Sequence, residues 1–465
     1  MKKRIFSAAL ALLLLVSLAG CFTGCRGTKT LPEPDYSDFV FPEDTGRLTV
    51  YADDQALGAL MDPAVELFRE RFPETEVSYK ILDADTYKTT AREEIDAGGG
   101  PDLVLFSSNT FMDIYKSMRE GRFEDLNPYF AADEDLDPGD FIGPVMDGGI
   151  QNGRRFVVPL SYEMPLLMTT RSILKELDMT ADEASSCEGF LDAAVRFHEA
   201  HPKGDLTLDL LGGFPPEKAY IRAMYLNLGF HFIDYGTGKV TIDEELFHRC
   251  MDIVKLYYDP EYDVGDLSKE EIDDGMYYQG GGLYKKQCLF DPTCISSYAS
   301  YRFATSYLNG KSVGTVLSVQ KNQYGGVTAE LGICAAVPAG SPNKAAAWEL
   351  LKILLSDEIQ GGHDENRYDL SYLWSGFPVR RASIESSLTA SALDAEAEKE
   401  ETIPLSLITR EEYIELVQSP TDASMVPNMY RRLIDEEIMP YIRDEKTWNQ
   451  CYKSLVKALK SYMKS

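Results

Sequence analysis

Side chains that can hydrogen-bond a polar ligand follow two short apolar segments, RLTVYA (47–52) and LVLF (103–106). They are Asp53, Asp54, Ser107, Ser108 and Asn109. Carboxylates accept hydrogen bonds, whereas hydroxyl and amide groups both donate and accept them. These residues are therefore candidate ligand contacts. Ser108 or Asn109 could also cap a helix that starts near Thr110, and the two roles are compatible.

The segments around these residues alternate between strand and helix patterns. An apolar strand at 47–52 is followed by an amphipathic helix at 61–74, a strand at 75–82, and a second helix that stops at Gly98-Gly99-Gly100-Pro101. The run at 103–106 is wholly apolar, as a strand covered on both faces must be. This order predicts an α/β fold with a mainly parallel sheet, and ligands of such sheets bind at the carboxyl ends of the strands.

Glu163 lies in an unusual strand, NGRRFVVPLSYEMPLLMTT (152–170), between Pro159 and Pro165. The turn Asn152-Gly153 predicts a β-hairpin. A strand with two prolines cannot pair along its whole length, and it suits a chain that leaves one sheet and enters another. Two later segments, 312–320 and 373–383, have the character of further crossings.

The N-terminus carries a targeting segment that is not part of the fold. Lys2, Lys3 and Arg4 precede a short apolar stretch and then Leu18-Ala19-Gly20-Cys21, which resembles a bacterial lipobox. We expect a signal peptide over 1–21, lipid on Cys21, and a flexible linker over 22–46 that is rich in proline, glycine and acids. A plain secretory signal is the alternative.

Composition excludes several classes of partner. The net charge is −29, whereas nucleic acid and anionic membrane surfaces need a basic footprint. The eight cysteines show no CxxC or metal-like spacing. Cys288 and Cys294 could form a disulfide, or could stay as buried thiols. His198 and His201 lack the HExxH spacing, so no metal and no cofactor are expected.

The order of motifs resembles that of the extracellular solute-binding proteins of ABC importers, in the branch that includes maltose-binding protein. The motifs are the lipobox, AGGGPDLVLF (97–106), GRFEDLNPY (121–129), NGRRFVVPLSYEM (152–164), DYGTGKVTIDEE (234–245), SPNKAAAWELLKILLSDEIQ (341–360) and SGFPVRR (375–381).

The resemblance implies a two-lobed periplasmic-binding-protein type II fold, an α/β fold whose lobes are joined by three crossovers. One lobe is expected from 47–158 plus 317–373, and the other from 159–316 plus 374–465. Glu163 falls on the first crossover, where the family often has a ligand-facing carboxylate. Aromatic residues that could stack on a solute are Phe214, Tyr298, Tyr301 and Trp374.

The resemblance implies that the protein captures a small solute and does not catalyse a reaction. The solute expected first is a sugar or oligosaccharide. Aromatic faces and carboxylates together suit sugars, whereas a cationic ligand would use the acids as counter-charges and a peptide would need a wider cleft. The expected partner is the transmembrane part of an ABC permease, and we expect a monomer on the extracellular face of the cell membrane. The alternatives are a surface-anchored glycosidase and a binding protein that presents its ligand to a sensor kinase.

Overall fold

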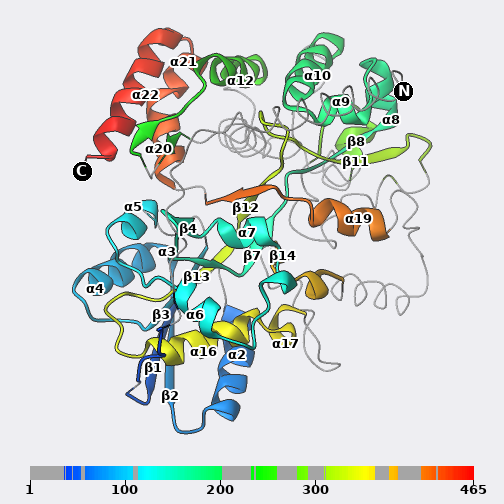
Figure 1. Cartoon of the computed structure of the whole chain (residues 1–465). Coiled ribbons are helices and arrows are strands. Elements are labelled where there is room, and N and C mark those ends of the chain that lie inside the picture. Colours follow the sequence, from blue (N-terminus) through cyan, green and yellow to red (C-terminus); the bar gives the residue numbers. More distant parts are fainter. Residues whose placement is uncertain are drawn as a thin grey trace, which may run out of the picture. The chain divides into compact units, whose positions relative to one another are not determined.

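The structure is a computed structural model of the whole chain (Figure 1). It describes residues 36, 38–43, 45–53, 58–107, 114–201, 232–234, 237–258, 280–291, 308, 311–361, 376–385, 410–425 and 428–464.

A five-stranded sheet is built mainly from the N-terminal part of the chain. Its strand order is β2 (Glu76–Leu82), β1 (Arg47–Asp53), β3 (Leu103–Ser107), β13 (Ile333–Ala336) and β6 (Val158–Pro159). The first three strands are parallel, as predicted, and β13 is antiparallel to both of its neighbours. All residues of 103–106 are buried, which explains why this segment carries no polar side chain.

Helices pack against this sheet. α2 (Gly58–Arg71) contacts both β2 and α16 (Lys344–Leu355), and α16 also contacts β1. The indole of Trp348 on α16 is fully buried and donates a hydrogen bond to Asp133 Oδ2 at 2.8 Å. This tryptophan therefore belongs to the core.

Two turns that the sequence predicts are confirmed. Gly98 and Gly100 have φ of 74° and 95°, so the helix α4 (Arg92–Asp96) ends in a left-handed turn before β3. Asn152 and Gly153 both have positive φ and join β4 (Ile150–Gln151) to β5 (Arg154–Arg155) as a hairpin.

A second, four-stranded sheet collects segments that are far apart in the sequence. Its order is β14 (Phe377–Pro378), β7 (Ser161–Glu163), β12 (Thr328–Leu331) and β15 (Asp422–Ser424). We call it the crossover sheet, because β6 continues into β7 after one residue and β12 continues into β13 after one residue. Two chain segments thus run from the five-stranded sheet directly into the crossover sheet.

The segment 312–320 lies elsewhere than expected. Its strand β11 (Thr315–Val319) pairs antiparallel with β8 (Leu166–Thr170) over five residue pairs. The segment that enters the five-stranded sheet is β12–β13, further along the chain. Both β11 and β12–β13 are apolar and rich in β-formers, so the sequence pattern does not distinguish between them.

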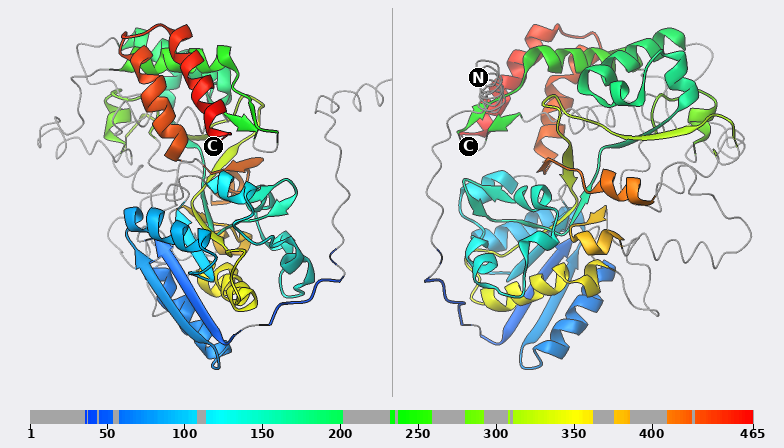
Figure 2. Two further views of the ribbon diagram at one scale, coloured as in Figure 1. Left: turned by 90° about the vertical axis from the view of Figure 1, so that its left-hand side faces the viewer. Right: turned by 45° about the vertical axis from the view of Figure 1, so that its right-hand side comes forward.

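The remaining large helices pack together away from these strands. α10 (Cys187–Ala200) contacts α12 (Glu244–Tyr257), and α12 contacts α21 (Met439–Ile442) of the C-terminal group. In that group α20 (Asn428–Glu437) packs against α22 (Trp448–Tyr462), as Figure 2 shows.

Shorter elements complete the described part of the chain. They are α3 (Ala84–Thr86), η1 (Tyr87–Ala91), α5 (Ile114–Arg119), α6 (Asn127–Ala132), η2 (Pro138–Asp140), α7 (Gly143–Asp147), β4 (Ile150–Gln151), β5 (Arg154–Arg155), α8 (Arg171–Glu176), α9 (Ala181–Ser185), β9 (Ile233–Asp234), β10 (Lys239–Val240), α14 (Gly281–Tyr284), α17 (Asp357–Gln360) and α19 (Arg410–Val417).

Gly376 allows β14 to approach β7 closely. Its φ is +104°, and a Cβ added there would stand 2.3 Å from the carbonyl oxygen of Tyr162.

Gly325 has φ of +79° but no atom within 4 Å of such a Cβ. We expect Gly325→Ala to lower the free energy of unfolding by about 1–2 kcal/mol through backbone strain alone. Gly376→Ala should cost about 2 kcal/mol more, because it adds a steric clash.

Urea unfolding of both variants measures this difference. Equal losses at the two positions would show that β14 does not approach β7 as described.

Candidate functional site

Asp53 and Ser107 meet at the carboxyl ends of β1 and β3. The carboxylate oxygen Oδ2 of Asp53 accepts hydrogen bonds from the backbone N–H of Ser107 at 2.8 Å and from its hydroxyl at 3.1 Å. Asp53 is fully buried. Its carboxyl group therefore holds the end of β3 in place, and the Ser107 hydroxyl proton is already used in that bond.

Two groups near Asp53 have raised pKa values. Burial, and then the charge of Asp53, raise the pKa of Tyr87 well above its ordinary value. The same two causes raise the pKa of the Cys334 thiol. A phenol and a thiol with raised pKa values stay protonated at neutral pH, and a protonated thiol is a poor nucleophile.

Glu163 lies beside a second carboxylate that the sequence analysis did not single out. In the crossover sheet Glu163 of β7 pairs with Glu330 of β12. Glu163 is half-buried and Glu330 is buried. Directly opposite residues of an antiparallel pair have Cβ atoms about 4.5–5.5 Å apart, so these two acids project from neighbouring positions of one face.

The Asp53–Ser107 pair and the Glu163–Glu330 pair are linked by one run of chain. Ser107 pairs with Ile333 at the start of β13, and Glu330 lies three residues earlier on β12. Three extended residues span about 10 Å. The polar groups predicted on the first parallel strands and on the first crossover are thus connected through β12 and β13.

Ser161 fixes β7 to this run. Its hydroxyl oxygen accepts a hydrogen bond from the backbone N–H of Ile333 at 2.9 Å, and its carbonyl accepts one from Gly332 at 2.9 Å. Ser161 is fully buried. The first and second crossing segments are therefore joined by side-chain and backbone bonds.

Gln360 joins the first and third crossing segments. Its amide Nε2 donates to the carbonyl of Leu160 at 3.1 Å and to that of Leu354 at 3.0 Å, and its Oε1 accepts from the N–H of Val379 at 2.9 Å. Leu160 lies between β6 and β7, and Val379 directly follows β14. One buried amide thus holds two strands of the crossover sheet to the end of α16.

Most of the residues proposed from sequence lie outside the described residues. They are Cys21, Asp54, Ser108, Asn109, Phe214, Tyr298, Tyr301 and Trp374. Cys294 lies outside them too, so the Cys288–Cys294 disulfide stays a prediction. Of the set, Asp53, Ser107 and Glu163 are described, and their place is given above.

Glu330 is a residue that sequence reasoning missed. It is the one acid in the segment VTAELGICAA (327–336). A lone acid inside an otherwise apolar strand was a usable signal, because buried carboxylates are rare unless they are paired or functional. The signal was overlooked because the crossing was expected at 312–320.

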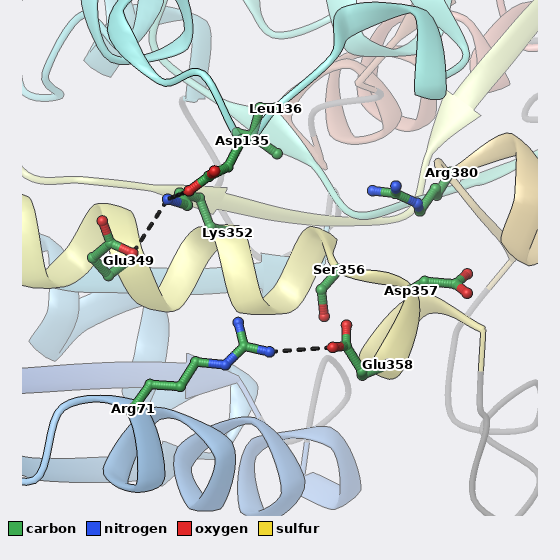
Figure 3. Close-up of a pocket in the computed structure, with 9 residues that line it drawn as sticks. All are labelled: Arg71, Asp135, Leu136, Glu349, Lys352, Ser356, Asp357, Glu358 and Arg380. Carbon is green, nitrogen blue, oxygen red and sulfur yellow. Dashed lines mark hydrogen bonds and ion pairs between the residues drawn. The ribbon is translucent and has the colours of Figure 1, made fainter.

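A separate pocket of about 440 Å³ lies between α2, α16 and α17 (Figure 3). Its three basic side chains are already paired: Arg71 with Glu358 at 3.2 Å, Lys352 with Asp133 at 2.9 Å, and Arg380 with Asp140 at 2.7 Å. A charged ligand would have to break these ion pairs. We therefore interpret the pocket as a surface ion-pair network.

Within the described ranges, no group of three or more His, Cys, Asp or Glu side chains could hold a metal ion. No helix within those ranges has the length and apolar character needed to span a bilayer.

The role of Gln360 leads to a test. Gln360→Met keeps the size of the side chain but leaves the Leu160 carbonyl and the Val379 N–H buried without their partner. We expect a loss of about 2–4 kcal/mol in the free energy of unfolding, measured in urea. Gln323→Met is the matched control, since no described residue hydrogen-bonds the Gln323 side chain, and it should cost under about 0.5 kcal/mol. Similar losses for both would contradict the role given to Gln360.

Residues 51–246 match the family model of the bacterial extracellular solute-binding proteins. The matched segment includes Asp53, Ser107 and Glu163. A comparison with curated protein sequences gives no match.

Solved structures resemble the chain over a longer range. The sugar-binding protein MalE from Xanthomonas citri has a TM-score of 0.61 at 14% identity. The match covers 90% of this chain and 97% of the MalE chain. The ABC substrate-binding protein from Listeria monocytogenes in complex with cycloalternan has a TM-score of 0.54 at 14% identity, covering 90% and 99%. The cyclic α-maltosyl-1,6-maltose binding protein from Arthrobacter globiformis has a TM-score of 0.54 at 16% identity, covering 91% and 100%.

At these identities the likeness shows the fold. The predicted fold class, the two-lobed α/β fold of periplasmic binding proteins, is confirmed. The chain therefore has the fold of the solute-binding proteins of ABC importers, and the family resemblance recognised in its sequence is confirmed by the match over residues 51–246.

Proposed function

We propose that this protein captures a sugar or oligosaccharide outside the cell and delivers it to an ABC importer. The observation that carries the proposal is the shared fold over about nine tenths of the chain with binding proteins whose ligands are saccharides. The family match over 51–246 supports the same reading.

Glu163 and Glu330 are proposed as the central polar contacts. Sugar hydroxyls donate hydrogen bonds to carboxylates, and bonds to a charged group are stronger than neutral ones. Asp53 and Ser107 would form the second polar set, with Asp54, Ser108 and Asn109 beside them in sequence. Phe214, Tyr298, Tyr301 and Trp374 remain proposed as the aromatic faces against which a sugar ring stacks.

Closure is proposed to turn about the crossover sheet. Strand β12 comes from the lobe proposed over 47–158 plus 317–373, and its partners come from the lobe proposed over 159–316 plus 374–465. Because β11 pairs with β8, the second crossing lies at β12–β13 and not at the proposed boundary 316/317. Binding energy would shift the population toward a closed form that the permease recognises. The buried hydrogen bonds of Ser161 and Gln360 stiffen the part of this sheet next to β6 and β13. The chain is therefore expected to bend after Glu163, toward Pro165.

The match to an extracellular solute-binding family supports a location outside the cell. The proposed partner is the transmembrane part of an ABC permease. Lipid on Cys21 would keep a monomer at the membrane surface, with residues 22–46 as its linker. The last part of that linker contacts the fold, since Thr45 donates two hydrogen bonds to Asn343 Oδ1, at 3.0 and 2.6 Å.

The two neighbouring carboxylates also bear on the alternative of a glycosidase. Retaining glycosidases hold two carboxyl groups about 5 Å apart. We assign Glu163 and Glu330 to binding, because the family and the structures that the chain matches are binding proteins of transporters. Incubation with oligosaccharides tests this assignment, and any released product would overturn it.

A thermal-shift screen over maltooligosaccharides, cyclic glucans and monosaccharides tests the binding function. A ligand present at about a hundred times its Kd stabilises the folded state by about 2.7 kcal/mol and raises the Tm. Calorimetry of a positive ligand then compares Glu163→Gln and Glu330→Gln with the wild type. We expect Kd to rise by about tenfold to a hundredfold for each, since a hydrogen bond to a charged group is lost.

Glu93→Gln is the control, because Glu93 is exposed on α4 and should leave Kd unchanged. A carbohydrate that binds with unchanged Kd in both crossover-sheet variants would place the site elsewhere. A screen in which only amino acids, polyamines or peptides raise the Tm would contradict the sugar proposal.

The lipid anchor has its own test, based on two nearby cysteines. Cys21→Ser should abolish incorporation of labelled palmitate and release the protein from the membrane fraction, because the lipidated cysteine is lost. Cys25→Ser should behave like the wild type. Loss of labelling in Cys25→Ser alone would move the anchor, and labelling of neither cysteine in the wild type would leave a plain secretory signal.

A further inference from the structure

Helices α10 and α12 run parallel, side by side, in a fixed register. The hydroxyl of Tyr257 on α12 donates a buried hydrogen bond to the carbonyl of Ala194 on α10 at 2.6 Å. Near the start of α10, Arg249 Nη1 lies 2.6 Å from Glu188 Oε2. Both contacts join residues about sixty positions apart, and both advance in the same direction along the two helices.

This register brings two cysteines together. Seven residues are about two helical turns, so positions seven apart lie on the same helix face. Seven residues before Ala194 is Cys187, and seven residues before Tyr257 is Cys250. Glu188 and Arg249 are the sequence neighbours of these two cysteines, and their ion pair lies at the same point of contact between the helices.

Both thiols lie in the interior. Cys187 is 7% exposed and Cys250 is fully buried. Burial raises the pKa of Cys250 well above its ordinary value, and the neighbouring Cys187 adds to that rise. Burial also raises the pKa of Cys187, to about 11. A charge on one sulfur would be felt at the other, which agrees with the contact that the register predicts.

We propose that Cys187 and Cys250 form a disulfide that staples α10 to α12 when the chain folds outside the cytoplasm. A disulfide needs Cα atoms about 5.5–6 Å apart, and the Glu188–Arg249 ion pair holds the neighbours of these two cysteines together. In the structure both residues are thiols.

The reaction is an exchange with an external disulfide. One thiolate attacks a sulfur of that disulfide and forms a mixed disulfide, and the second thiolate then displaces the remaining thiol. The two cysteines lose two protons and two electrons, the S–S bond forms, and the oxidant is reduced to two thiols. Because the raised pKa values make both thiols slow to react once buried, the bond should form during folding.

Oxidative refolding of the full chain tests the proposal. The protein is unfolded with reductant, refolded with a mixture of oxidised and reduced glutathione, alkylated with iodoacetamide without further reduction, and digested with trypsin. We expect a linked pair of peptides, 176–196 with 250–255, which separates into its two parts on reduction. Recovery of these peptides singly, each alkylated, or linked to other cysteines, would overturn the proposal.

Two variants make the assignment specific. Cys334 is buried on β13 in the five-stranded sheet, so Cys334→Ala should leave the linked pair intact. Cys250→Ala should abolish the pair and leave Cys187 alkylated. The wild-type digest decides the proposal even if Cys250→Ala fails to refold.

A stability readout distinguishes a structural staple from an incidental bond. Reduction should lower the Tm of the oxidised wild type by roughly 4–8 °C, because the cross-link no longer restricts the unfolded chain. Reduction should leave the Tm of Cys250→Ala unchanged. A linked wild type whose Tm does not fall on reduction would contradict the stapling role.

Discussion

The architecture depends on one strand, β7, that is paired on both edges. Tyr162, at its centre, pairs with Leu331 of β12 on one side and with Phe377 of β14 on the other. Its ring is fully buried, and its hydroxyl donates to the carbonyl of Val417 at 2.6 Å. Three residues of chain thereby hold β12, β14 and the end of α19, which lie 169, 215 and 255 positions further along the sequence. A slip of one residue in β7 would turn Glu163 to the opposite face of the sheet.

The same constraint explains how polar side chains come to lie in an apolar setting. Ser161 and Gln360 are buried, and both satisfy backbone groups that the short strands leave unpaired. With those groups satisfied, β7 and β12 hold Glu163 and Glu330 as a directly opposite pair.

Local features were predictable from the sequence, and long-range register was not. The Gly98–Pro101 break, the Asn152-Gly153 hairpin and the apolar segment 103–106 follow from backbone preferences and burial of a few neighbouring residues. The place of 312–320 was missed because two segments of similar composition compete for one role, and only pairing partners decide between them. Asp53 was predicted as a ligand contact, yet its Oδ2 already accepts two bonds from Ser107. Sequence type alone does not reveal such an internal use. Glu330 was missed because its importance comes from a partner 167 residues away, Glu163.

Solution X-ray scattering of the protein with and without the carbohydrate that most raises its Tm tests the central claim, that solute capture is coupled to movement of two lobes about the crossover sheet. The radius of gyration should fall when the carbohydrate saturates the protein, since the closed form is more compact than the open one. A radius of gyration that stays the same at saturation, with binding verified by calorimetry on the same sample, would contradict capture by closure.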